Sequence, residues 1–179
     1  MKGIVFSEFL ELVEEKFGME MVDKIINESN LESGGAYTAV GTYAFSEMLQ
    51  LLQSLSGNTG ISIDDLLLTY GEHFFKVLKE NYSDMLAAYN GPLEMLSSIE
   101  NHIHVEVKKI YPDAELPTFE VLEKTKTRLV MIYTSSRAMH YFGLGLMNKT
   151  FEHFNSSAEI VLEKINKDGT KVKFIINKN

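Results

Sequence analysis

Residues 104–117 read HVEVKKIYPDAELP, and this stretch contains the point at which the pattern of the chain changes from helix to strand. The residue before a proline is pushed out of helical space, so the helix that precedes Tyr111-Pro112 is predicted to end there. Beyond Pro112, residues 118–124 and 127–135 carry β-branched and aromatic side chains separated by a short polar turn. The sequence therefore predicts an α+β fold, with an N-terminal helical layer followed by a small antiparallel sheet and a packed helix.

Hydrophobic spacing predicts the other elements on both sides of this stretch. Gly18 and Gly57 are expected to end two helices, and Ser62 followed by Asp65 resembles a capping box that opens a third helix, which runs to about Leu78. The remaining predictions are a short helix at 83–89, a helix at 92–110 with Pro92 in its first turn, a helix at 138–154, and hairpin strands at 159–165 and 171–176 around Lys167-Asp168-Gly169.

The composition excludes several functional classes. The 179 residues are 45% hydrophobic and carry 17 Lys and Arg against 25 Asp and Glu, for a formal net charge of -8. This balance disfavours a surface that binds nucleic acid or an anionic membrane. The chain has no cysteine, which excludes disulfides, zinc–cysteine sites and cysteine nucleophiles. It also has no signal-peptide or membrane-spanning pattern, so a soluble cytoplasmic protein is expected.

The motifs of hydrolases, kinases and dehydrogenases are missing: there is no GxSxG, no P-loop and no Rossmann glycine fingerprint. Tyr133, Ser135 and Arg137, by contrast, form Tyr-x-Ser-x-Arg at the end of a predicted strand, where alternation places them on one face. Such a group can clamp a carboxylate, because arginine binds carboxylates bidentately. Taken alone, the same three residues are more typical of a solvated strand edge.

His104 changes this interpretation. A lone histidine on a helix is usually a packed or surface residue, and none of the five histidines belongs to an HExxH motif. A neutral imidazole in an apolar pocket is also the proximal ligand of haem iron, and haem carries propionates that need a clamp. His104 and the Tyr-x-Ser-x-Arg group together supply partners for both ends of a haem. His102 points in a different direction and is interpreted as a surface histidine.

At these residues the chain resembles the H-NOX family, the haem nitric oxide/oxygen binding domains that also occur in soluble guanylate cyclase. The resemblance implies a single H-NOX domain over residues 1–179, with a helical part at about 1–112 and an α/β part at about 113–179. It also implies a b-type haem (iron protoporphyrin IX), held non-covalently between these parts. The motifs that carry the resemblance are Met1-Lys2-Gly3-Ile4-Val5, Tyr70-Gly71-Glu72-His73-Phe74-Phe75, His104 seven residues before Tyr111-Pro112, Leu116-Pro117 and Tyr133-Thr134-Ser135-Ser136-Arg137.

Carried over position by position, the resemblance implies roles for individual residues. His104 is the expected iron ligand. Pro117 is expected to press on the macrocycle and hold it distorted. The propionates are expected to be bound by Tyr133, Ser135 and Arg137. The wall on the distal side, where the gas binds, is expected to be apolar and to consist of Val5, Phe9, Phe74, Leu78, Phe142 and Leu146.

The distal residues determine which gas is expected to bind. Bound O2 is stabilised by a hydrogen-bond donor, which O2-binding members of the family supply as a tyrosine at the position that Phe142 matches here, whereas nitric oxide needs no donor. The expected function is therefore a nitric oxide sensor that binds O2 poorly and also binds CO. A register shift of one residue would instead bring Tyr141 into the pocket and give an O2-binding protein, because adjacent residues lie about 100° apart around a helix.

The mode of action also follows from the resemblance. No catalytic or output domain is recognised in the chain, so the protein is expected not to be an enzyme but to signal by conformational change to a separate partner. The family suggests a bacterial sensor histidine kinase or a cyclic-di-GMP enzyme. The remaining alternative is a haem-independent interaction domain, against which the presence of both His104 and Arg137 counts.

Overall fold

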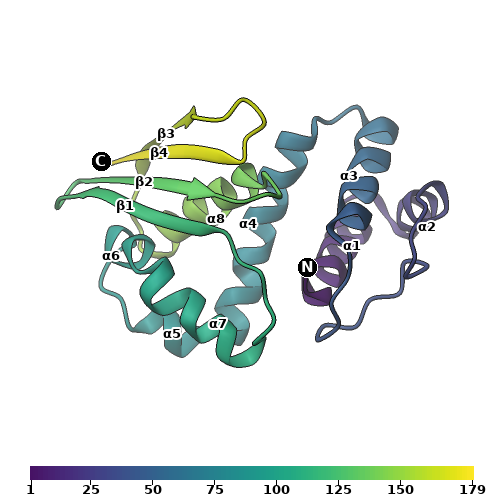
Figure 1. The fold of residues 1–179 in the computed structure, drawn as a ribbon, viewed down its shortest axis with the longest axis horizontal. Helices are drawn as coiled ribbons and strands as arrows, with labels where there is room; N and C mark the ends of the chain where they lie inside the picture. The colour runs from purple at the N-terminus through teal and green to yellow at the C-terminus, as the bar shows by residue number, and fades with distance from the viewer. The chain divides into compact units, whose positions relative to one another are not determined.

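The computed structural model describes every residue of the chain, in two compact units, Met1–Tyr70 and Gly71–Asn179 (Figure 1). The boundary falls inside helix α4, Ile63–Asn81, whose first turns belong to the first unit. Helices give way to strands later in the chain, between Ile110 and Thr118, as the sequence predicts. None of the helices is long and apolar enough to cross a membrane.

The first unit is a group of helices with an aromatic and aliphatic core. It contains α1 (Gly3–Phe17), α2 (Met19–Glu28), α3 (Phe45–Thr59) and the start of α4. Helical spacing places Phe6, Phe9 and Val13 on the buried face of α1. The largest fully buried side chains of this unit are Phe6, Phe9, Ile25, Met48, Leu51, Leu52, Leu55 and Tyr70.

Glycine conformation sets two of the helix ends in this unit. Gly18 ends α1, as predicted, with φ +84°. The prediction that Gly57 ends α3 is wrong, because the helix continues until Gly60, which adopts the left-handed conformation that commonly closes a helix. Helix α2 was not predicted; it begins directly after Gly18 and buries Val22 and Ile25, which are three residues apart on one face.

The predicted capping box at the start of α4 is confirmed, with aspartate in place of the usual glutamate. The backbone N–H of Asp65 donates to Ser62 Oγ at 3.1 Å, and the Ser62 hydroxyl donates to Asp65 Oδ2 at 2.6 Å. These bonds satisfy one of the backbone donors that a helix leaves unpaired at its N-terminus. The helix then runs to Asn81, three residues beyond the predicted end at Leu78.

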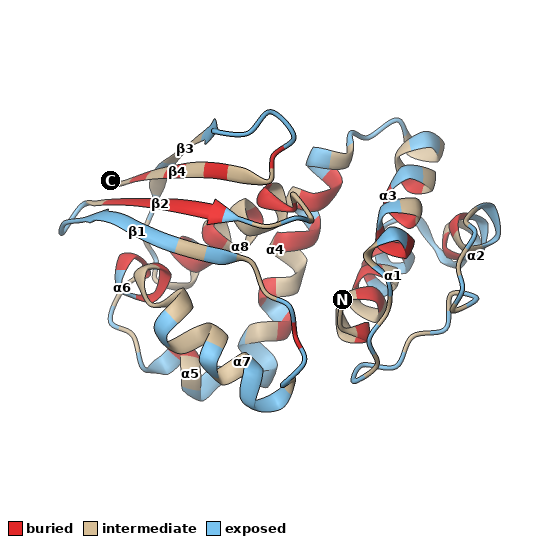
Figure 2. Ribbon diagram, in the orientation of Figure 1, coloured by how far each residue is buried: buried red, intermediate tan, exposed pale blue.

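The second unit is organised around one antiparallel sheet with strand order β1-β2-β4-β3. The α+β class and the four predicted strands are confirmed, and Gly169 in the β3–β4 turn has φ +78°. The central strand β2 is buried along most of its length, whereas the edge strand β1 is largely exposed (Figure 2). The strands are β1 (Thr118–Lys124), β2 (Arg128–Thr134), β3 (Ala158–Lys164) and β4 (Lys171–Lys178).

One face of this sheet packs against two helices, α6 (Pro92–Ser97) and α8 (His140–His153). Alternate residues of the two central strands point into this core, as a strand period of two requires. The buried cluster consists of Leu129, Met131, Tyr133, Val172, Phe174 and Ile176 from the sheet, and Leu93, Leu96, Met147 and Phe151 from the helices. Burial of this apolar surface anchors Tyr133 and the segments that follow β2.

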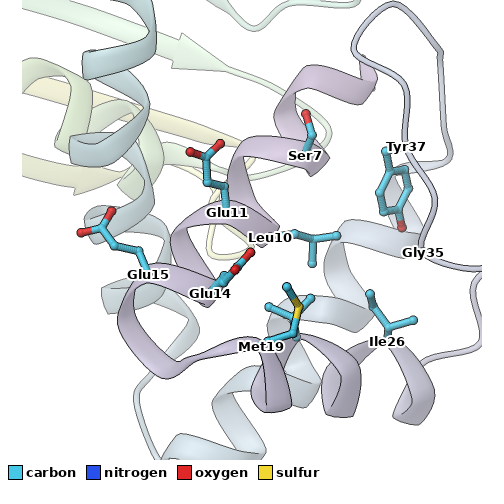
Figure 3. A pocket seen from close by; sticks show the side chains of 10 residues that line it. Ser7, Leu10, Glu11, Glu14, Glu15, Met19, Ile26, Gly35 and Tyr37 are labelled. Carbon is cyan, nitrogen blue, oxygen red and sulfur yellow. The ribbon is translucent and has the colours of Figure 1, made fainter.

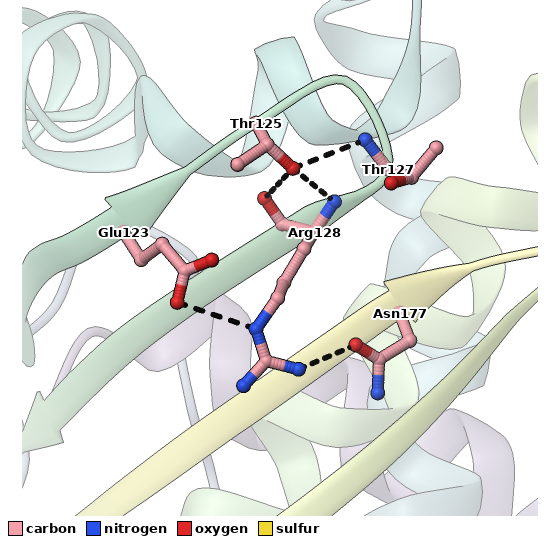
Figure 4. A network of polar contacts seen from close by, with 5 residues as sticks. All are labelled: Glu123, Thr125, Thr127, Arg128 and Asn177. Atoms are coloured by element: carbon pink, nitrogen blue, oxygen red, sulfur yellow. Dashed lines mark hydrogen bonds and ion pairs between the residues drawn. The ribbon is translucent and has the colours of Figure 1, made fainter.

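Polar contacts of Arg128 fix the turn between β1 and β2 (Figure 4). Its Nε donates to Glu123 Oε2 at 3.2 Å, and its Nη1 donates to Asn177 Oδ1 at 2.7 Å. Its backbone N–H donates to Thr125 Oγ1 at 3.0 Å. One arginine therefore ties three strands together at the end of the sheet that is remote from the Tyr-x-Ser-x-Arg group.

The segment between α4 and the sheet is helical but not continuous. It contains α5 (Ser83–Ala87), α6, a π-helix η1 (Ile99–Ile103) and α7 (His104–Ile110). Pro92 occupies the first turn of α6, as predicted. The single helix expected at 92–110 is thus interrupted, because the backbone N–H of His104 bonds to the carbonyl of Ile99, five residues back.

Candidate functional site

His104 is the first residue of α7, directly after the π-helix, and its side chain is 14% exposed. Its Nδ1 lies 3.0 Å from Glu100 Oε1. A carboxylate can only accept a hydrogen bond, so Nδ1 carries the ring proton and Nε2 presents a lone pair that can bind a metal. Burial lowers the pKa of His104, and the charge of Glu100 and its hydrogen bond oppose this shift. These contacts favour the neutral imidazole, the form that can bind a metal through Nε2.

Glu100 makes a second bond through the same oxygen. The backbone N–H of Phe119 donates to Glu100 Oε1 at 2.9 Å. Phe119 belongs to β1 and follows Pro117 by two residues, so this carboxylate connects the π-helix, His104 and the start of the sheet. Glu100 was not predicted as a site residue, although its position four residues before His104 is a spacing that brings helical side chains together.

The Phe119 ring contacts the rings of both His104 and Tyr133. Its centroid is 6.1 Å from that of His104 and 5.5 Å from that of Tyr133. Pro117, which precedes β1, is partly buried. The structure thus brings together the predicted iron ligand and the first residue of the predicted propionate clamp, with an aromatic ring that the sequence analysis did not identify.

The Tyr-x-Ser-x-Arg residues lie where β2 ends and the chain leaves the sheet. Tyr133 is 2% exposed, and burial raises the pKa of its hydroxyl despite a hydrogen bond with Ser135. The prediction that strand alternation aligns all three residues is wrong, because β2 ends at Thr134. Ser135 and Arg137 are instead held by a turn in which the Arg137 backbone N–H donates to Ser135 Oγ at 3.2 Å.

The Arg137 guanidinium points at Glu115, in the segment that leads to β1. Its Nη1 donates to the Glu115 carbonyl oxygen at 2.7 Å, and its Nη2 donates to Glu115 Oε2 at 2.6 Å. The Glu115 side chain is 84% exposed, and exposed ion pairs contribute only about 0.2–1 kcal/mol. The guanidinium is therefore oriented by its neighbour, but a stronger carboxylate ligand can displace that neighbour at small cost.

Two of the predicted distal residues, Phe74 on α4 and Phe142 on α8, are in contact. Their ring centroids are 5.5 Å apart, with an angle of 57° between the planes. The two helices touch here, because a Cβ added to Gly71 would lie only 2.1 Å from the carbonyl oxygen of Phe142. Glycine at this position is thus required by the close approach of the α4 and α8 backbones.

Tyr141 has different neighbours from Phe142. Its ring centroid is 4.8 Å from that of His140, and Lys164 Nζ on β3 lies 5.9 Å from the centre of its ring. Phe142 contacts Phe74 instead. The two adjacent residues of α8 therefore present their rings to different parts of the second unit.

The other predicted residues are distributed over both units. Val5 and Phe9 lie in the first unit, where Phe9 is 1% exposed and the Val5 carbonyl accepts a hydrogen bond of 2.5 Å from the Tyr70 hydroxyl. Leu78 and Leu146 lie in the second unit and are partly exposed. His102, interpreted above as a surface histidine, is partly buried, and its Nδ1 lies 2.5 Å from the Tyr89 hydroxyl oxygen.

A pocket of about 790 Å³ opens on the first unit between α1, α2 and the loop that follows α2 (Figure 3). Glu11, Glu14 and Glu15 contribute carboxylates to its wall, and Leu10 and Met19 contribute apolar surface. None of the predicted site residues lines this pocket. It is therefore distinct from the groups around His104 and Phe142.

The family model described as Haem-NO-binding matches residues 2–162, and the chain belongs to this family, the H-NOX domains. An H-NOX protein from K. algicida, solved in the unliganded Fe(II) state, is 75% identical and superposes with a TM-score of 0.98, covering 100% of this chain and 97% of that one. An H-NOX from Shewanella woodyi, solved in the Fe(II)CO state with IWP-051 bound, is 33% identical with a TM-score of 0.84, covering 100% and 95%.

A curated relative is the soluble guanylate cyclase gcy-35 of Caenorhabditis elegans, which is 25% identical over 144 residues. The match covers 79% of this chain but only 21% of the cyclase. Membership of the family makes the chain a haem-based gas-sensor domain rather than an enzyme. The predicted family, fold and sensor class are thereby confirmed.

Proposed function

We propose that this domain senses nitric oxide at the ferrous iron of a b-type haem ligated by His104, and that it binds O2 poorly. The observation that carries the proposal is the contact between Phe74 and Phe142, two rings without a hydrogen-bond donor, at 5.5 Å. The haem supplies the iron to which the gas binds. The protein residues hold this group, set the strength of its axial ligand and determine which gases are stabilised.

The donor set around His104 fits a haem. Nε2 of His104 is available because Nδ1 is bonded to Glu100. On the same unit, Tyr133, Ser135 and Arg137 offer hydroxyl and guanidinium donors, which suit a pair of propionates. The guanidinium of Arg137 already binds one carboxylate, that of Glu115, and the exposure of the Glu115 side chain to water favours its replacement by a propionate.

The contacts of α8 support Phe142 as the distal residue. A bound O2 gains stability from a nearby donor, so an apolar wall lowers O2 affinity while leaving nitric oxide binding strong. Phe142 lies against Phe74, the other predicted distal aromatic residue, whereas Tyr141 lies against His140 and Lys164. We therefore propose that Phe142 lines the gas site, with Leu78 and Leu146 of the same unit. Val5 and Phe9, in the first unit, stay predictions from the family resemblance. CO, which also needs no donor, is expected to bind.

Signalling is proposed to begin at His104. If nitric oxide binding released His104 from the iron, His104 and α7 would be able to move relative to Pro117. Such a change is a two-state shift driven by different contacts in the free and bound forms. We propose that a separate cytoplasmic partner, a sensor histidine kinase or a cyclic-di-GMP enzyme, responds to the altered surface.

The ligand assignment is tested by haem loading. His104→Ala should lose bound haem during gel filtration after reconstitution and should regain it when imidazole is added, because imidazole replaces the missing ligand. His102→Ala is the matched control, since His102 is two residues away and bonds to Tyr89, and it should retain haem like the parent protein. Full haem retention by His104→Ala without imidazole would refute the assignment.

A further inference from the structure

Glu100 makes two hydrogen bonds beside His104, the proposed haem ligand. One of its carboxylate oxygens, Oε1, lies 3.0 Å from His104 Nδ1 and accepts the backbone N–H of Phe119 at 2.9 Å. The two donors come from α7 and β1, which are separated in the chain by the Tyr111-Pro112 turn. A single atom therefore connects the predicted iron ligand to the first strand of the sheet.

The backbone around Glu100 is also irregular. Glu100 lies in the π-helix Ile99–Ile103, and α7 begins only after it, at His104. A π-helical turn is rare and is found mostly as a single turn at functional sites, because the wider turn weakens regular hydrogen bonding. The irregular turn and the shared carboxylate oxygen are two separate observations at the same position.

We propose that Glu100 is a positioning residue that fixes the tautomer of His104, strengthens it as an iron ligand and ties its position to β1. This inference rests on the proposed function. A carboxylate that accepts the second ring N–H of a metal-ligating histidine orients the ring and raises its basicity. The stronger ligand resists displacement when nitric oxide binds, so Glu100 would set how readily the His104–iron bond is lost.

The hydrogen bond from the Phe119 backbone also couples the position of Glu100 to strand β1. Because Glu100 Oε1 is bonded to both His104 and the Phe119 backbone, a displacement of His104 would pull this carboxylate away from β1. Pro117, which is expected to press on the macrocycle, lies two residues before the strand residue that Glu100 holds. A change at the iron would therefore reach the sheet edge through one side chain.

The test compares Glu100→Gln and Glu100→Ala with the parent protein, and uses Glu106→Gln as the matched control. Glu106 lies in α7, two residues from His104, but it pairs with Lys109. Glutamine keeps an acceptor oxygen and loses the charge, and alanine loses both. In the ferrous form, resonance Raman spectroscopy should show a lower iron–histidine stretching frequency for Gln, and a still lower one for Ala.

The same variants should raise the haem reduction potential and release haem about tenfold faster, as the loss of such partners typically weakens metal binding. After nitric oxide is added, they should lose the His104–iron bond faster than the parent protein. Glu106→Gln should match the parent in all three measurements. Unchanged frequency, potential and release rate in both folded Glu100 variants would overturn the proposal.

A haem-free measurement separates this inference from the proposed function. In the apoprotein, nitrogen NMR of the His104 ring reports which nitrogen carries the proton. The positioning role of Glu100 predicts that the ring proton of His104 is fixed on Nδ1 in the parent protein and that Glu100→Ala contains a mixture of tautomers. A parent protein that takes up no haem but shows this tautomer change would refute the proposed function and retain the positioning role. A mixture already present in the parent would refute the positioning role alone.

Discussion

The rings of Phe74 and Phe142 meet at 5.5 Å, one from α4 and the other from α8. Both residues lack a polar atom in the side chain, and the backbones beneath them touch at Gly71. This contact forms an apolar surface in the second unit at the positions that we propose to govern gas preference.

A hydroxyl placed at Phe142 should stabilise bound O2. Phe142→Tyr is expected to increase O2 affinity by about 3- to 10-fold, which corresponds to one hydrogen bond of about 0.5–1.5 kcal/mol. Tyr141→Phe is the matched control and should leave O2 affinity unchanged, because Tyr141 faces His140 and Lys164. Equilibrium O2 titration of the ferrous protein measures both. Loss of O2 binding in Tyr141→Phe would place Tyr141, not Phe142, at the iron.

Removal of the carboxylate beside Arg137 should slow haem loss. Glu115→Ala eliminates a competitor for the guanidinium, and because the exposed pair contributes only about 0.2–1 kcal/mol, haem dissociation should slow by no more than about fivefold. Transfer of haem to an acceptor protein gives the rate. Glu120→Ala, an exposed change on β1, should have no effect. Faster haem loss in Glu115→Ala would mean that Glu115 holds Arg137 in its binding position.

The capping bonds at the start of α4 should contribute to stability independently of haem. Ser62→Ala is expected to lower the free energy of unfolding by about 1 kcal/mol, since it removes the acceptor for the Asp65 N–H. Urea unfolding of the haem-free protein, followed by circular dichroism, measures the change. Ser136→Ala, at an exposed loop position, should leave the midpoint unchanged. Equal midpoints for Ser62→Ala and the parent would show that the cap does not stabilise the native state.

Much of the fold could be predicted from the sequence because its signals are local. The strand predicted at 118–124 coincides with β1, since alternation and turn residues define such elements within a few positions. The π-helix before His104 could not be predicted, because a change of hydrogen-bond partner from four to five residues back leaves no mark in hydrophobic spacing. The short helix α2 was missed although Val22 and Ile25, its two buried residues, stand at helical spacing.

The candidate site, like the fold, could be predicted from the sequence only in part. His104 and Tyr133 could be singled out from the chain itself, because they combine with Arg137 into a set that suits one cofactor. The four-residue spacing of Glu100 and His104 is a local signal, but the bond from the Phe119 backbone to Glu100 joins segments 19 residues apart and could not be predicted. Glu115 was missed as well, since its contact with Arg137 joins segments 22 residues apart.

Absorption spectroscopy of the reconstituted, anaerobically reduced protein, first with O2 and then with nitric oxide, decides whether this domain is a selective nitric oxide sensor. The proposed site predicts a haem spectrum that O2 leaves unchanged and that nitric oxide shifts to the form in which His104 no longer ligates the iron. A stable O2-bound spectrum would contradict the donor-free distal site, and the absence of any haem band would contradict the proposed function as a whole.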